Sequence, residues 1–141
     1  MAAKTPAPKQ LLVTRLFEVG QDREVPIPGF FIIASRRKIR SVTEFSDEEA
    51  AEFMGILRKV RAGMLEVLGI KDVYLFQNED TAWNFHLWIF PRLKWMERFG
   101  RKIESVRPII DYAKREMARD EVMREIDEYV QKMKTYMEDY R

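Results

Sequence analysis

Apolar residues form short blocks in the first part of the chain and helical stripes further on. Residues 11–19, "LLVTRLFEV", are rich in strand-forming side chains and predict a single strand. Residues 30–35, "FFIIAS", form a continuous apolar run that predicts a buried strand. Residues 21–29 contain two prolines and a glycine, which indicate a loop between them. Two later blocks, at 72–77 and 84–90, predict two strands joined by a short link.

A long helix is predicted for residues 46–69. Ser46 and Glu49 have the spacing of a capping box, and Gly69 stands where a glycine often ends a helix. The apolar residues between them recur every three or four positions and form one face, which consists of Phe53, Ile56, Leu57, Val60, Met64 and Leu68.

The C-terminal third, after Pro108, also has a helical pattern. Its apolar stripe consists of Val122, Ile126, Tyr129, Val130, Met133 and Met137. The order of strands, long helix, two strands and further helices predicts an α+β fold with an antiparallel sheet. We expect residues 1–10 to be a disordered tail, 11–107 the main domain, and 108–141 a helical extension packed on that domain.

Composition narrows the classes of function. The 141 residues suit one domain, and a net charge of +2 does not indicate a general nucleic-acid binder. No segment has the length and apolar character of a membrane span or of a signal peptide. With one histidine and no cysteine, neither a disulfide nor a protein-built zinc site is expected, and we expect no cofactor. The absence of cysteine agrees with a cytoplasmic location.

The chain's only histidine, His86, lies in the last predicted strand, within "TAWNFHLWIFPR". Because alternate strand residues face opposite sides, Asn84, His86 and Trp88 share one face, opposite the apolar residues Phe85, Leu87 and Ile89. Two interpretations are open on this spacing alone. His86 is either a half-buried sheet residue satisfied by a neighbour, or a reactive group on a polar face.

This strand resembles the signature of the histidine-triad (HIT) superfamily, in which three histidines alternate with apolar residues. Asn84, His86 and Trp88 occupy the three histidine positions, and Pro91 and Arg92 match a common continuation. The upstream stretch "PGFFIIASRRKIRSVTEFSDEEAAEF" resembles another block of the same superfamily. The resemblance covers about residues 22–92 and implies a HIT-like α+β fold, here with an extended C-terminal helical segment.

The resemblance implies a nucleotide hydrolase or nucleotidyl transferase acting on a nucleotide or a dinucleoside polyphosphate. In such proteins the middle histidine, here His86, attacks the α-phosphate and forms a covalent nucleotidyl-histidine. A neutral imidazole is a suitable nucleophile near neutral pH. The resemblance further implies a homodimer, with the two sheets joined edge to edge.

Two departures from the signature keep a second interpretation open. Asn84 cannot carry a proton at neutral pH, and Trp88 offers one N–H donor and no acid. The alternative is therefore a catalytically weakened nucleotide-binding or interaction protein on the same fold. By the same resemblance Thr81 and Asn78 are expected to contact phosphate, and Asp22 to bind ribose hydroxyls. Asn84 and Trp88 complete the expected substrate-binding set.

Overall fold

The computed structural model describes residues 9–82 and 84–140. Residues 1–8, which make up most of the tail predicted for residues 1–10, lie outside the described residues. None of the helices in the described ranges combines the length and the apolar composition needed to cross a membrane.

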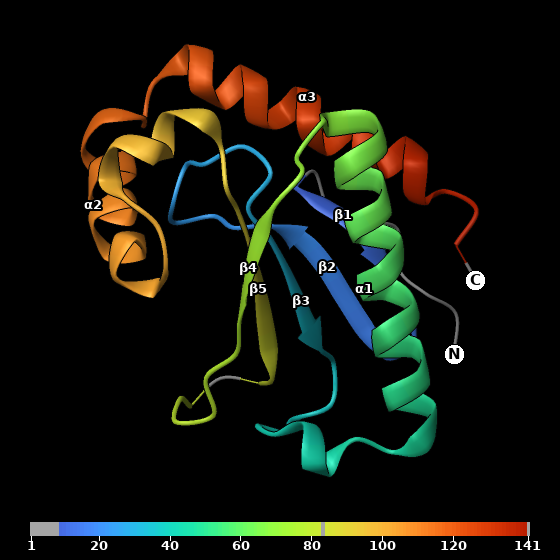
Figure 1. Cartoon of the computed structure of the whole chain (residues 1–141). Coiled ribbons are helices and arrows are strands. Elements are labelled where there is room, and N and C mark those ends of the chain that lie inside the picture. Colours follow the sequence, from blue (N-terminus) through green and yellow to red (C-terminus); the bar gives the residue numbers. More distant parts are fainter. Residues whose placement is uncertain (1–8, 83, 141) are drawn as a thin grey trace.

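One antiparallel sheet forms the centre of the described protein (Figure 1). Its spatial order is β1-β2-β3-β5-β4, and every neighbouring pair is antiparallel. The strands are β1 (Gln10–Val13), β2 (Phe17–Gln21), β3 (Phe31–Ser35), β4 (Val73–Phe76) and β5 (His86–Pro91). This arrangement confirms the predicted α+β class with an antiparallel sheet.

The N-terminal strand differs from its prediction. The single strand expected at 11–19 is wrong, because the chain turns at Thr14 and forms the two paired strands β1 and β2. The Thr14 hydroxyl accepts hydrogen bonds from the backbone N–H groups of Leu16 and Phe17, at 3.2 and 2.9 Å. A threonine side chain that bonds the backbone in this way mimics a turn, which the strand-forming composition of the segment conceals.

The helices follow the sequence more closely. They are α1 (Asp47–Leu68), α2 (Val106–Glu116) and α3 (Asp120–Met137), with short 3₁₀ helices η1 (Val42–Glu44), η2 (Lys94–Phe99) and η3 (Ile103–Ser105). Ser46 and Glu49 form the predicted capping box, and Gly69 ends α1 with a left-handed φ of 69°. The first turn of α2 includes Pro108, where a missing N–H removes no helical hydrogen bond. The predicted boundary at 107/108 therefore falls inside α2.

The two faces of the sheet carry different layers (Figure 1). Helices α1 and α3 pack on one face over a buried cluster that includes Phe17, Ile33 and Ile89. Helix α2 and η2 pack on the other face over a second cluster that includes Phe30, Phe90 and Met96. The second layer covers its face only in part, and the uncovered part contains five of the six residues predicted to be functional.

We expect the buried carboxylate of Glu49 to make stability depend on acid pH. Its side chain is 3% exposed and accepts two hydrogen bonds from the Arg37 guanidinium, at 2.8 and 3.0 Å. The Arg37 bonds, with smaller contributions from the Ser46 hydrogen bonds and against the effect of burial, lower the pKa of Glu49 from 4.5 to about 2. Because the folded-state pKa is depressed, the stabilisation is complete above pH 4.5 and is lost as the pH falls towards 2.

Urea unfolding of Glu49→Gln measures this contribution. The variant should lose about 2 kcal/mol of unfolding free energy near neutral pH, as expected for a charged hydrogen bond, and the difference from the unsubstituted protein should shrink as the pH falls. Asp47→Asn is the control, because Asp47 is exposed in the same helical turn. Equal stability of Glu49→Gln and the unsubstituted protein at neutral pH would contradict the assignment.

Candidate active site

The register of the sheet places His86 in a row with two other residues on the uncovered face. Ala34 of β3 lies between His86 of β5 and Glu18 of β2, as the Cα partner of each. Neighbouring strands are about 4.8 Å apart, so the His86 and Glu18 backbones are about 10 Å apart. The small Ala34 side chain leaves an open floor between them.

A cleft of about 1050 Å³ opens above this floor. Five of the six residues predicted for the site line it together, namely Asp22, Asn78, Asn84, His86 and Trp88. They come from the β2–β3 loop, the β4–β5 loop and the start of β5, which are distant in sequence and meet only through the sheet. The predicted alternation of β5 is confirmed, since Phe85, Leu87 and Ile89 are buried on the opposite face.

The geometry of His86 selects one form of its imidazole. Its Nδ1 lies 2.9 Å from the backbone carbonyl oxygen of Asn84. A carbonyl oxygen only accepts, so Nδ1 carries the proton and donates it. Nε2, at the other end of the ring, then holds a free lone pair. The ring is half-buried and lines the cleft, and among the described residues only its Nδ1 has a hydrogen-bond partner, so His86 is not a core histidine satisfied on both nitrogens.

Asn84 and Trp88 have structural partners of their own. The Asn84 side-chain N–H group donates to the Ser35 carbonyl oxygen at 3.4 Å, and this bond holds the Asn84 side chain against β3. The backbone carbonyl of Asn84 orients the His86 ring. The Trp88 ring packs edge-on against Phe30, with centroids 5.3 Å apart. Trp88 thus forms a packed wall of the cleft beside His86 and has no acidic proton to donate.

Asp22 lies at the opposite wall of the cleft. Its Oδ2 accepts hydrogen bonds from the backbone N–H groups of Val25 at 2.7 Å and Glu24 at 3.1 Å. Burial raises the pKa of the Asp22 carboxyl, and these two hydrogen bonds act in the opposite direction. Within the described part of the chain no hydrogen-bond donor reaches Oδ1, so this oxygen keeps its capacity to accept.

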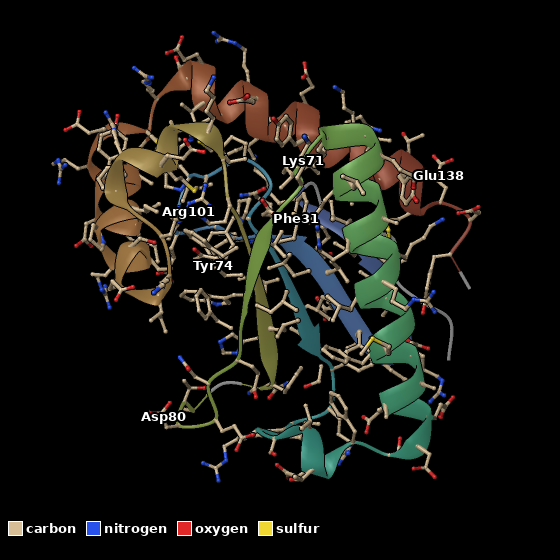
Figure 2. All side chains as sticks on the ribbon, viewed as in Figure 1. Phe31, Lys71, Tyr74, Asp80, Arg101 and Glu138 are labelled. Atoms are coloured by element: carbon tan, nitrogen blue, oxygen red, sulfur yellow. The ribbon has the colours of Figure 1, made fainter. Side chains whose placement is uncertain are left out.

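The β4–β5 loop contributes Asn78 to the cleft, while Thr81 lies half-buried further along the same loop. Thr81 is not among the described residues that line the cleft. Asp80 marks the loop tip at the end of the sheet remote from η2 and η3 (Figure 2). Asn78 and His86 therefore line the same cleft, and Thr81 does not belong to its lining.

Several lining residues were not predicted from the sequence. Helix α2 and η3 add Ile103, Val106, Arg107, Ile110 and Lys114. A smaller apolar lobe of about 180 Å³ adjoins His86 and is bounded by Phe76, Trp88, Ile103 and Val106. The helical stripe of Val106, Ile109, Ile110 and Ala113 signals that α2 packs on something. It does not signal that α2 packs beside His86, because that position is set by tertiary contacts.

The 3₁₀ segment that leads to α2 is held against β4 and β5. Arg92 donates to the Gly100 carbonyl oxygen at 2.7 Å and to the Ser105 hydroxyl at 3.2 Å. The Lys102 backbone N–H donates to the Tyr74 hydroxyl at 2.7 Å, and Tyr74 and Arg101 lie on this side of the sheet (Figure 2). These contacts fix the start of α2 relative to the strand that carries His86.

A metal does not fit the residues of this site. Within residues 9–82 and 84–140, no three His, Cys, Asp or Glu side chains are grouped so that they could hold a metal ion. A zinc site in a protein usually takes three or four such ligands.

The fold is that of histidine-triad proteins. A diadenosine triphosphate hydrolase from Plasmodium falciparum, solved in complex with cyclomarin A, aligns with a TM-score of 0.63 at 13% identity, over 96% of this chain and 80% of the hydrolase. A zinc-bound histidine triad family protein from Mycobacterium smegmatis aligns with a TM-score of 0.62 at 14% identity, over 95% of this chain and 86% of that protein.

The NitFhit protein of Caenorhabditis elegans has a TM-score of 0.57 at 18% identity. The alignment covers 82% of this chain but only 29% of NitFhit, so this chain corresponds to a minor part of that protein. No family model matches the sequence, and no curated protein matches it significantly. The shared fold, and with it the predicted HIT-like architecture, is thus confirmed by structure and not by sequence identity.

Proposed function

We propose that the protein is a nucleotide hydrolase or nucleotidyl transferase that acts at an α-phosphate through a covalent nucleotidyl-histidine on His86. The orientation of His86 carries the proposal, because the Asn84 carbonyl holds the proton on Nδ1 and leaves the Nε2 lone pair at the cleft. The neighbouring folds support the ligand class, since one of them is a diadenosine triphosphate hydrolase. Asp22 and Asn78 both line the cleft, and we propose that Asp22 accepts from ribose hydroxyls and that Asn78 contacts phosphate.

The reaction has two balanced steps. In the first, the Nε2 lone pair forms a bond to the α-phosphorus, and the bond from phosphorus to the leaving group breaks with its electron pair on that group. The imidazolium that forms is stabilised by the Nδ1–H donation to the Asn84 carbonyl. In the second, a water oxygen attacks phosphorus, the P–N electron pair returns to Nε2, and the proton of the attacking water passes to solvent. A transferase would use another acceptor in place of water.

The absence of an acid on Trp88, beside His86, restricts which leaving groups can depart. Trp88 cannot protonate a departing atom, because its only polar hydrogen is a neutral indole N–H. A leaving group that is stable as an anion needs no such proton and should react fastest. Thr81 remains a proposed contact to the leaving group or phosphate.

One observation favours a second candidate function. Asn84 and Trp88 both have structural partners and supply no acid, as a catalytically weakened nucleotide-binding protein would require. Both functions predict nucleotide binding in the cleft, and only the first predicts turnover.

A panel of nucleotides separates the two candidates. Purine and uridine monophosphates, a uridine sugar diphosphate and dinucleoside polyphosphates should be screened for thermal shift and for hydrolysis. A ligand that binds only the folded protein raises the melting temperature in proportion to its occupancy. A shift together with product formation supports the enzyme, and a shift without product supports the binding protein. No shift with any nucleotide would refute both.

We also propose a homodimer in which the sheets join through the edge strand β4. One side of β4 has no strand partner among the described residues, and Leu75 on this strand is 48% exposed. An unprotected edge strand is a ready surface for pairing with a second copy. Light scattering at micromolar concentration should give twice the 16.9 kDa chain mass, and Leu75→Arg should shift it towards one chain mass. A single chain mass for the unsubstituted protein would contradict the dimer.

A further inference from the structure

Helix α2 lies along the cleft from the His86 end to the Asp22 end. Val106, its first residue, bounds the small lobe together with His86 and Trp88. Lys114, two turns later, is close enough to Asp22 to lower the pKa of that carboxyl, against the larger effect of burial. At 1.5 Å per residue the helix covers about 12 Å between these two positions. Arg107 and Lys114 both line the cleft, so the same face of α2 follows its whole length.

Arg107 is a free cation at the His86 end. It is exposed, it lines the cleft, and it follows Val106 directly. Within the described residues no hydrogen bond, ion pair or ring contact involves its guanidinium. The nearby Arg92, by contrast, is used structurally at Gly100 and Ser105. A guanidinium offers five donors in a planar fork that matches phosphate oxygens.

Charge is distributed unevenly around the cleft. Of the cations that line it, Arg107 and Lys114 come from α2, and Lys38 comes from the segment after β3. The opposite wall carries the acidic residues Glu18, Asp22 and Glu24. An anionic group in the cleft is therefore attracted towards α2 and repelled from the β2 side. A sugar hydroxyl, which can donate to a carboxylate, is suited to the acidic wall.

We propose that Arg107 binds the phosphate attacked by His86 and supplies the positive charge that Asn84 and Trp88 cannot. This inference rests on the proposed function and deepens it, because it assigns a phosphate-binding residue from the C-terminal helices. A guanidinium is a fixed positive charge and not an acid, so Arg107 stabilises charge on the phosphate and gives no proton to the leaving group. The preference for a leaving group that departs as an anion is therefore unchanged by its presence.

The test compares nucleotides with their nucleosides in Arg107→Gln. Isothermal titration with AMP and adenosine, and with UMP and uridine, gives the affinity that the phosphate adds. Loss of a charged hydrogen bond should weaken monophosphate binding by about tenfold and leave nucleoside binding unchanged. Arg107→Lys should give an intermediate value, because the charge stays and the paired donors are lost. High salt should reduce the difference between the unsubstituted protein and Arg107→Gln.

Arg115→Gln is the matched control. Arg115 belongs to the same helix, is exposed, and contacts Glu116 and the Tyr112 ring outside the cleft lining. It changes the net charge equally, so the proposal requires that it leave the ratio of monophosphate to nucleoside affinity unaltered. An unchanged ratio in Arg107→Gln, with the unsubstituted protein binding nucleotide, overturns the role of Arg107 alone. Failure of the unsubstituted protein to bind any nucleotide overturns the proposed function and this inference with it.

Discussion

His86→Ala is expected to lower the turnover of a dinucleoside polyphosphate by at least about a thousandfold. Removal of a nucleophile takes away the covalent route itself, which is a larger loss than removal of a positioning group. Nucleotide affinity should change by less than about tenfold, since Asp22 and Arg107 stay in place. Steady-state kinetics and titration of the same protein preparations measure both quantities.

Asn84→Ala is the control for His86→Ala. The hydrogen bond to His86 comes from the backbone of Asn84, so the imidazole keeps its orientation when the side chain is removed. The lost bond to Ser35 is long, at 3.4 Å, and turnover should fall by no more than about tenfold. Turnover in His86→Ala equal to that of the unsubstituted protein would exclude His86 as the nucleophile.

The second large effect is expected from Ala34→Leu. Ala34 forms the cleft floor between His86 and Glu18, and a longer side chain there occupies the space in which a phosphate has to approach Nε2. We expect monophosphate affinity to fall by about a hundredfold, which corresponds to about 2.7 kcal/mol. The melting temperature should change little, because the added atoms point into an open cleft and not into a packed core.

Ala51→Leu is the matched control for Ala34→Leu, since Ala51 is exposed on α1, which packs on the other face of the sheet. It should leave nucleotide affinity unchanged. Monophosphate binding by Ala34→Leu that equals binding by Ala51→Leu would show that the ligand does not occupy the floor beside His86.

The parts of the fold that were predicted correctly depend on local patterns. The capping box of Ser46 and Glu49, the left-handed Gly69 and the alternation of β5 are each determined by neighbouring residues, and the structure contains all three. The split of the N-terminal strand was missed because one side chain, Thr14, bonds the backbone and turns the chain. The strand propensities of the residues alone do not reveal such a bond.

The site residues within the segment that resembles the HIT superfamily, about residues 22–92, were predictable, and those that follow it were not. Asp22, Asn78 and the β5 residues were expected, and they do line one cleft. The contribution of α2 was missed, because the sequence places Arg107 more than 20 residues after His86 and contains no signal for the face on which the helix packs. That face is selected by Arg92 and Tyr74, which anchor the preceding segment.

The most direct measurement is intact-protein mass spectrometry during turnover of a nucleoside phosphoramidate or dinucleoside polyphosphate. Samples should be quenched in base, because a phosphorus–nitrogen bond hydrolyses in acid. The proposed function predicts a transient increase in mass by one nucleotidyl group, located by fragmentation on His86 and absent from His86→Ala. Continued turnover with unmodified protein at every time point, and equal turnover by His86→Ala, would contradict covalent catalysis and leave nucleotide binding as the function of the cleft.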